Sequence, residues 1–187
     1  MKKSFGPKVM PFPAPVWVVG TYDAEGKPNM MTASWTGICC SKPPCIAVSV
    51  RKSRYSYSNI VARQAFTICV PSGQYAKEVD YWGMVSGRDV DKVAKSGLTA
   101  VPSELVDAPY IQEFPVAMEC KLLHTVEIGS HTQFIGEVLD IKVDQAMLGP
   151  EGRPDVEKLG VFVYFDGYRE IGEYLAQPFS IGKELVG

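Results

Sequence analysis

Residues 29–58 read NMMTASWTGICCSKPPCIAVSVRKSRYSYS, a stretch that divides into a strand, a turn and a second strand. In residues 29–39, apolar and hydroxyl-bearing side chains alternate, which is the period-two pattern of a half-buried strand. Two adjacent prolines follow, and proline removes hydrogen-bond donors from a sheet. The continuous apolar run at residues 45–50 then ends in the cations and hydroxyl groups of residues 51–56. One strand therefore offers hydroxyl groups and Trp35 while the next ends in cations, which suits a flat aromatic ligand that carries a phosphate.

The same patterns, followed outward along the chain, predict further strands and only short helices. Turn-forming residues at 23–28 join two strands into a hairpin, and Gly129-Ser130-His131 joins another pair. The predicted strands are residues 16–22, 29–39, 45–50, 65–70, 98–101, 116–128, 133–143, 161–164 and 168–171. The predicted helices are residues 57–63, 75–85 and 90–95, the last followed by a C-cap at Gly97. So many strands favour a mainly β protein with short α insertions, a barrel or sandwich, over a doubly wound sheet.

Length and composition are those of an ordinary globular domain. The 187 residues are 46% apolar and 21% charged, which is enough to bury a core. We expect a single domain over residues 1–187, with an N-terminal arm at about residues 1–12 and a C-terminal tail at about residues 174–187.

The charge balance and the hydropathy exclude two classes of partner. A net charge of −2 gives no reason to expect nucleic acid or an anionic membrane surface. No apolar run reaches the length of a membrane span, and the basic residues 1–8 lack the apolar core of a signal peptide. We therefore expect a cytoplasmic protein with neither a nucleic-acid nor a membrane partner.

The five cysteines lie mostly in apolar, strand-like runs, at Cys39, Cys40, Cys45, Cys69 and Cys120. Neither a CxxC motif nor a Cys/His pair at zinc spacing occurs, so no metal site is predicted. Free cysteine is among the most buried residue types, which favours reduced thiols in the core. A catalytic thiol is the alternative, and only Cys45, beside the proline turn, stands in a suitable place for one.

Side chains for acid–base catalysis are almost absent. The chain has two histidines, of which His124 lies in a predicted strand and His131 in a turn. Nucleophile elbows, zinc-protease motifs, phosphate-binding loops and dinucleotide-binding glycine motifs do not occur. We assign no catalytic residue.

The cluster from Arg51 to Ser56 joins a buried strand to a predicted helix, and this arrangement favours an anion site. A solvated loop is the alternative interpretation of the same residues. Residues 86–92, which read SGRDVDK, are a second candidate contact because they again join a glycine to a helix start, although a Ser-Gly pair between helices is ordinary. Trp35 would provide a stacking surface or, alternatively, a core side chain.

Five segments, taken together and in order, resemble the flavoredoxin branch of the flavin reductase-like, FMN-binding split-barrel family. They read PNMMTASWTGICCSKPPCIAVSV, RKSRYSYSNI, FTICVPS, YWGMVSGRDVDKVAKSGLT and IGSHTQFIGEV, and the similarity runs from about residue 13 to residue 172. The resemblance implies an antiparallel split β-barrel that binds FMN non-covalently. It also implies a homodimer with the flavin near the subunit boundary.

The resemblance implies a role for each matching segment. Beside the isoalloxazine ring it places Asn29, Met30, Thr32, Ala33, Ser34, Trp35 and Thr36. Around the ribityl chain and phosphate it places Ser49, Val50, Arg51, Lys52, Ser53 and Ser56, with Ser86, Gly87 and Lys92 closing the phosphate side. Which of Arg51, Lys52 and Arg54 holds the phosphate stays open.

The resulting functional hypothesis is an electron-transferring flavoprotein, an NAD(P)H-dependent flavin reductase or flavoredoxin-type oxidoreductase. Hydride or electron transfer at a flavin needs no side-chain nucleophile, which agrees with the absence of catalytic motifs. NAD(P)H would be a substrate that lies across the flavin near His131. A second hypothesis is an FMN electron carrier without NAD(P)H activity that an iron–sulfur protein reduces. A third is a barrel that has lost its flavin.

Overall fold

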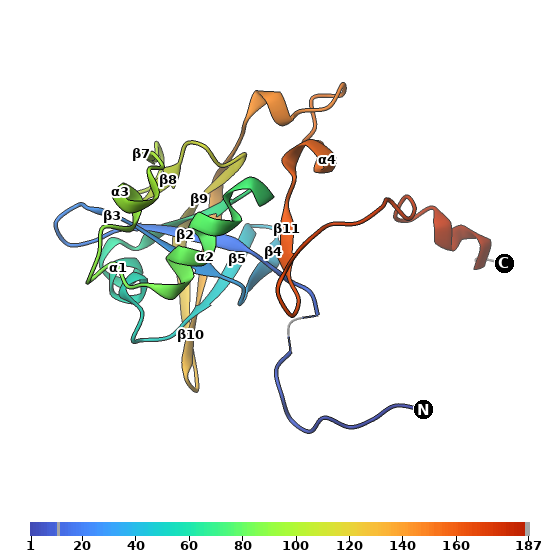
Figure 1. Cartoon of the computed structure of the whole chain (residues 1–187), viewed down its shortest axis with the longest axis horizontal. Helices are drawn as coiled ribbons and strands as arrows, with labels where there is room; N and C mark the ends of the chain where they lie inside the picture. Colours follow the sequence, from blue (N-terminus) through green and yellow to red (C-terminus); the bar gives the residue numbers. More distant parts are fainter. Residues whose placement is uncertain (11, 186–187) are drawn as a thin grey trace.

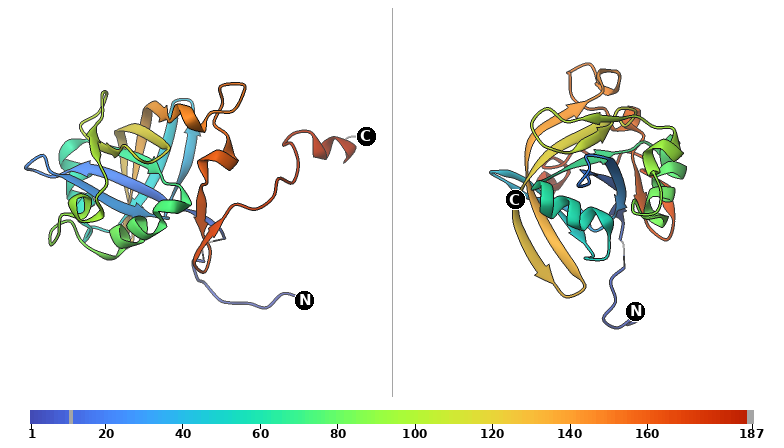
Figure 2. Two further views of the ribbon diagram at one scale, coloured as in Figure 1. Left: turned by 45° about the horizontal axis from the view of Figure 1, so that its top comes forward. Right: turned by 90° about the vertical axis from the view of Figure 1, so that its left-hand side faces the viewer.

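The computed structural model describes residues 1–10 and 12–185. Its main element is a seven-stranded antiparallel sheet in the order β3-β2-β6-β9-β10-β5-β4. The sheet curls into an open barrel, and helices α1 and α2 pack against its β2–β3 side (Figures 1 and 2). Two small sheets, β1-β11-β12 and β7-β8, complete the architecture.

The elements have the following bounds. The strands are β1 Ala14–Pro15, β2 Trp17–Tyr22, β3 Pro28–Ala33, β4 Thr36–Ser41, β5 Pro44–Val50, β6 Ala65–Val70, β7 Ala100–Pro102, β8 Pro109–Ile111, β9 Val116–Ile128, β10 His131–Val143, β11 Phe162–Tyr164 and β12 Tyr168–Glu170. The helices are α1 Tyr55–Arg63, α2 Ala76–Met84, α3 Lys92–Ser96 and α4 Val156–Leu159, with 3-10 turns η1 Gly73–Tyr75, η2 Gln145–Met147 and η3 Ile181–Leu185.

Both predicted hairpins are confirmed. Strands β2 and β3 pair from Trp17 opposite Ala33 to Tyr22 opposite Pro28. Asp23 closes their turn, because its Oδ1 accepts the amide hydrogens of Glu25 at 3.0 Å and Lys27 at 2.9 Å. Strands β9 and β10 form the long second hairpin. The C-cap of α3 is likewise at Gly97, as predicted.

Two apolar clusters lie on opposite faces of the β2–β3 hairpin. Val19 and Met31 belong to the cluster inside the barrel, together with Phe66 and Phe134. Their chain neighbours on β2 and β3, by contrast, pack in a second cluster between the barrel and α2, around Trp82. Burying each large apolar side chain contributes about 1.5–3 kcal/mol, so β3 is fixed from both sides.

The prediction of one continuous strand over residues 29–39 is wrong. The strand ends at Ala33, and β4 begins at Thr36 on the opposite edge of the sheet. Between them the backbone carbonyl of Trp35 accepts a hydrogen bond from the amide of Ser49 at 2.8 Å. The alternation of residue types continues across this crossing although β3 is mostly buried and the second half of β4 is exposed, so periodicity alone does not reveal the break.

The prediction that the cysteine thiols are buried is confirmed for only some of the five cysteines. Cys45, Cys69 and Cys120 are buried and free, but Cys39 and Cys40 are free and exposed. The reason is topological, because β4 is an edge strand whose second half extends beyond the barrel core.

Both chain ends run away from the barrel (Figure 1). The predicted arm at residues 1–12 and tail at residues 174–187 include Pro11 and residues 186–187, which lie outside the described residues. The described part of the tail ends in η3, and it carries exposed apolar side chains such as Leu175 and Phe179. Across residues 1–10 and 12–185, no helix is both long and apolar enough to cross a membrane.

Candidate functional site

Two neighbouring cavities form a continuous groove along β3. The first has a volume of about 330 Å³ and lies between β3, the start of α1 and the loop after α2. The second has a volume of about 290 Å³ and lies between the end of β3, the end of β5 and the start of β10. Met31, Arg51 and Arg54 line both cavities, which joins the two into one groove.

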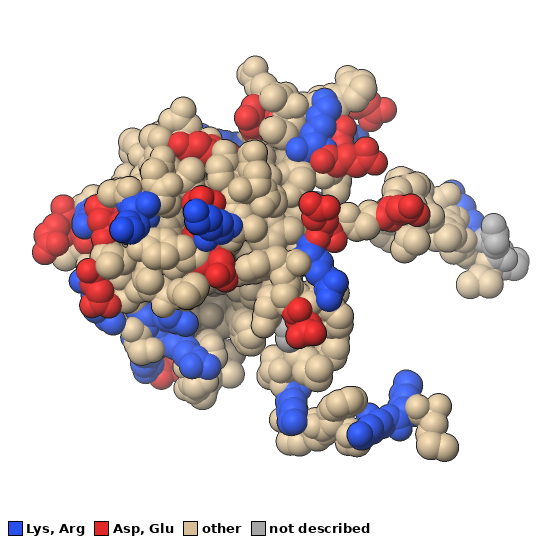
Figure 3. Space-filling view, viewed as in Figure 1, with Lys and Arg blue, Asp and Glu red and all other residues tan. Residues whose placement is uncertain are grey.

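Three arginines give the first cavity its charge. Arg51 and Arg54 come from the loop before α1, and Arg88 comes from the loop after α2. Arg88 is held in place, because its Nη1 donates to the Ser53 carbonyl at 2.9 Å and its guanidinium lies 5.4 Å from the centroid of the Tyr55 ring. Lys and Arg side chains also gather over the loop before α1 in the space-filling view (Figure 3).

The N-terminus of α1 opens into the same cavity. Arg54 is its N-cap residue, with extended backbone and no side-chain hydrogen bond to the first turn. The amide of Arg54 donates to the Arg51 carbonyl at 2.9 Å and that of Tyr57 to the Arg54 carbonyl at 3.0 Å, and the helix dipole adds positive potential at this end. Arginines beside such a terminus make a site suited to phosphate.

Asn29 forms the floor of the first cavity and leaves one acceptor unpaired. Its Nδ2 donates to Ser56 Oγ at 2.9 Å and to Thr21 Oγ1 at 3.3 Å, while its buried Oδ1 has no hydrogen-bond partner. A Cβ atom on Gly87 would lie 2.1 Å from this oxygen, so only glycine allows the loop to approach Asn29. The unpaired oxygen is an acceptor for a hydroxyl group in the cavity.

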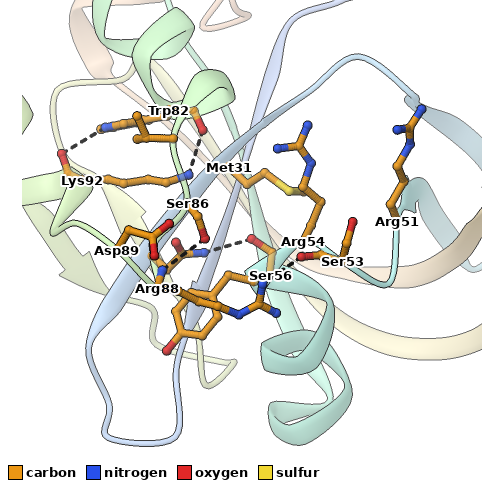
Figure 4. A pocket seen from close by; sticks show the side chains of 14 residues that line it. Met31, Arg51, Ser53, Arg54, Ser56, Trp82, Ser86, Arg88, Asp89 and Lys92 are labelled. Atoms are coloured by element: carbon orange, nitrogen blue, oxygen red, sulfur yellow. Dashed lines mark hydrogen bonds between the residues drawn. The ribbon is translucent and has the colours of Figure 1, made fainter.

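Lys92 ties the walls of the first cavity together. Its Nζ donates to the Met30 carbonyl at 2.9 Å and to the Trp82 carbonyl at 2.7 Å, and the Trp82 indole donates back to the Lys92 carbonyl at 3.1 Å (Figure 4). The residue is only 4% exposed. Burial, and secondly the charge of Arg54, lower the pKa of Lys92 to about 8. The amine therefore fixes β3 against the end of α2.

The second cavity is more open and combines an aromatic surface with small residues. Trp35 lies at its margin with 47% of its surface exposed, so the core interpretation of this residue is wrong. Ser49 and Val50 come from β5, and His131 comes from the first position of β10. The His131 Nδ1 lies 2.9 Å from Ser130 Oγ.

Two hydroxyl groups expected at this end already have partners. Thr32 Oγ1 donates to the carbonyl of Val79 and so anchors α2 to β3. Thr36 Oγ1 donates to the carbonyl of Ala47 at 2.9 Å. The hydroxyl groups that a ligand in the second cavity would meet are therefore those of Ser34 and Ser49, not that of Thr32.

The structure brings most of the predicted site residues together. The first cavity is lined by Asn29, Arg51, Ser53, Ser56, Ser86, Gly87 and Lys92, and the second by Thr32, Ala33, Ser34, Trp35, Ser49, Val50 and, again, Arg51.

Three predicted residues line neither cavity. The Met30 side chain is buried in the core. Thr36 lies on the other side of Trp35 from the second cavity, outside both cavities. Lys52 Nζ points instead to the Glu127 carboxylate at 2.6 Å.

Arg88 and Asp89 lie in the candidate contact segment 86–92, but sequence reasoning assigned neither of them a role, and both line the first cavity. The sequence does contain an indication of such a role, because Arg88 follows Ser86-Gly87 directly in a segment that resembles the family.

An open antiparallel barrel with a cationic groove beside β3 places the chain in the class of split-barrel proteins. A model of the flavin reductase like domain matches residues 9–172, and the chain therefore belongs to this family of flavoproteins. Within the family it falls in the flavoredoxin branch.

Solved structures support this placement. The chain is 50% identical to the flavoredoxin of Desulfovibrio vulgaris (Miyazaki F), with a TM-score of 0.93 over 97% of this chain and 100% of that one. It is 31% identical to the flavoredoxin from Methanosarcina acetivorans, with a TM-score of 0.92 over 99% of each chain. A Shewanella frigidimarina protein with a split barrel domain, 20% identical with a TM-score of 0.81 over 90% of this chain and 87% of that one, shares the fold. The predicted antiparallel split barrel is thereby confirmed.

Proposed function

We propose that the groove binds FMN non-covalently and that the protein transfers electrons through it. The observation that carries this proposal is the chemistry of the first cavity, in which three arginines and an uncapped helix N-terminus lie beside the unpaired oxygen of Asn29. The charged groups suit a phosphate, and Asn29 Oδ1 suits a hydroxyl of the ribityl chain.

The residues of the first cavity bind and orient the phosphate end. Arg54 and Arg88 provide the cations, and Arg51 extends the positive charge toward the second cavity. Because Lys52 is paired with Glu127, the structure favours Arg51 and Arg54 over Lys52 for this role. Lys92 holds the wall and does so from a buried position.

The residues of the second cavity support the ring end and leave it accessible. Backbone groups from residues 32–35 and the side chain of Trp35 provide a polar and an aromatic border. FMN, when bound, supplies hydride and electron transfer, so no acid–base side chain is required. Solvent exposure of Trp35 keeps this end open to a second molecule.

NAD(P)H-dependent reduction is our first choice for the reaction, with NAD(P)H as substrate at the open end near His131. A carrier without NAD(P)H activity is the second candidate. The observation that supports a carrier is the open second cavity, where a redox protein such as an iron–sulfur protein can approach as readily as a nucleotide can.

The first experiment is an absorbance spectrum of the purified protein, followed by release of the chromophore by heat and its chromatography. Flavin bands and release of FMN alone support the proposal. A featureless spectrum that stays featureless after addition of FMN contradicts it and favours a barrel without flavin.

Stopped-flow reduction of the flavin-loaded protein then separates the two reactions. Fast bleaching by NADH or NADPH identifies a reductase. Slow bleaching by both, with prompt reduction by a low-potential iron–sulfur protein, identifies a carrier. If His131→Ala leaves the rate of hydride transfer unchanged, His131 takes no part in nucleotide binding.

We further propose a homodimer, a single domain over residues 1–187 and a cytoplasmic location. The exposed apolar side chains of the described arm and tail support a partner chain, because such surface is seldom left in water. Sedimentation of the purified protein measures the oligomeric state directly.

A further inference from the structure

Three cysteines gather at the turn of the β4–β5 hairpin, away from the groove. Ile38 pairs with Ile46, but the next pairing is Cys40 with Cys45, so a β-bulge lies between them. Cys39 is the additional residue, and both Cys39 and Cys40 oppose the single residue Cys45. Such bulges re-aim side chains, and here the bulge sets Cys40 directly across from Cys45.

The members of this cluster differ in accessibility. Cys45 is 5% exposed, whereas Cys39 and Cys40 are exposed and free. Free cysteines are usually buried, so two adjacent free thiols at the surface need an explanation beyond packing. An exposed thiol opposite a buried one combines an accessible nucleophile with a protected second thiol.

The backbone geometry suits a bond between Cys40 and Cys45. Directly opposed residues of an antiparallel pair have Cα atoms about 4.5–5.5 Å apart. A disulfide requires a Cα separation of about 4.4–6.8 Å. The register, which sets Cys40 opposite Cys45, therefore places the two residues at a strand spacing that overlaps the range for a disulfide.

We propose that Cys40 and Cys45 form a redox-active dithiol that exchanges with low-molecular-weight disulfides. The proposal does not depend on the flavin groove. Cys40 Sγ, as the thiolate, attacks one sulfur of a disulfide R–S–S–R, and the first thiol RSH leaves after taking up a proton. Cys45 then attacks Cys40 Sγ in the mixed disulfide, loses its proton and releases the second RSH. The protein gives up two electrons, and the external disulfide gains two.

The position of Cys45 opposite Cys40 suits a resolving thiol, and its environment affects the rates in both directions. Burial raises the pKa of Cys45, and the neighbouring Cys40, Cys39 and Glu137 raise it further. The smaller thiolate fraction slows the attack of Cys45 on the mixed disulfide. A reductant that attacks the exposed Cys40 sulfur must expel this poorly acidic thiol, so the internal disulfide is slow to reverse.

The test uses the reduced full-length protein and oxidised glutathione, followed by acid quenching and intact-mass spectrometry. We expect the wild-type chain to lose two hydrogens. Fragmentation of the proteolytic peptide that contains residues 39–45 should give no backbone fragments between Cys40 and Cys45.

Two exposed-site variants provide the comparison. Cys39→Ser should lose two hydrogens as the wild type does, while Cys40→Ser should lose none. A wild-type chain that only gains glutathione, that bonds Cys39 to Cys40, or that links to a second chain overturns the proposal. Equal loss of the reaction in Cys39→Ser and Cys40→Ser overturns it as well.

Discussion

Gly87→Ala tests the packing on which the first cavity depends. A Cβ atom at this position would lie 2.1 Å from Asn29 Oδ1, more than an ångström short of the 3.4 Å at which ordinary contact begins. Asn29 cannot move without losing its hydrogen bonds to Ser56 at 2.9 Å and Thr21 at 3.3 Å. Each bond is worth about 1 kcal/mol, so we expect a loss of about 2 kcal/mol, within the range of about 1–3 kcal/mol for overpacking.

Two measurements can detect a loss of about 2 kcal/mol in the free energy of unfolding. Thermal unfolding of the flavin-free protein should shift down by about 4–8 °C, given about 2–4 °C per kcal/mol for a chain of this size. The Kd for FMN should rise at least about tenfold, or about 1.4 kcal/mol, because the displaced Asn29 side chain enters the cavity. Fluorescence titration measures this Kd.

Gly83→Ala is the matched control on the neighbouring helix. Its added Cβ would lie 3.6 Å from Thr32 Cβ, an ordinary contact. We expect an unchanged Kd and a midpoint raised by the better helix propensity of alanine, worth about 1 kcal/mol. A Gly87→Ala protein with wild-type midpoint and wild-type Kd would refute the packing argument. A lowered midpoint with an unchanged Kd would refute only the placement of FMN.

Three further predictions concern charged side chains. Arg54→Ala should raise the Kd for FMN at least about tenfold, whereas Lys52→Ala should raise it less than about threefold. Equal effects of the two substitutions in a titration at fixed salt would contradict the assignment of the phosphate contact to Arg54 over Lys52. Lys92 has a folded-state pKa of about 8, below its unfolded value of about 10.5, so the unfolded chain holds more protons between these values. Its contribution to the free energy of unfolding should therefore rise with pH over that window, and in urea titrations this contribution should appear as a steeper rise with pH for the wild type than for Lys92→Met. Glu119→Ala should cost about 1–3 kcal/mol for each amide that it leaves without a partner in the same assay, because the buried Glu119 carboxylate accepts from the amides of Glu104 and Leu105. Glu104→Ala, at an exposed position, should cost little, and comparable losses would contradict this.

The sequence was sufficient for the features that local chemistry determines. The β2–β3 hairpin follows from apolar runs on either side of a turn that Asp23 closes. The Gly97 C-cap follows from the left-handed backbone that glycine adopts readily, here with φ of 73°. The segment before α1 could be singled out as a candidate anion site because cations, hydroxyl groups and a helix start follow one another directly.

Features that depend on the closure of the barrel could not be predicted in this way. The crossing at Ser34-Trp35 carries the chain from one edge of the sheet to the other, and no local pattern marks it. Exposure of Cys39 and Cys40 depends on β4 being an edge strand, which is a property of strand order. The direction of Lys52 is decided by Glu127, a residue distant in sequence on β9.

The two ends of the groove differ in how firmly their walls are held, and this difference predicts a division of roles. At the first cavity, Lys92, Asn29 and Arg88 each bridge separate elements through hydrogen bonds. At the second, Trp35 is half exposed and its side chain borders open solvent. Firm walls lower the entropy that binding must remove, so affinity should come from the first cavity. Substitutions in the first cavity should change the Kd for FMN. Trp35→Ala, in contrast, should change the rate of reduction by an external donor more than it changes the Kd. The opposite pattern would contradict the assignment of binding to the first cavity and of access to the second.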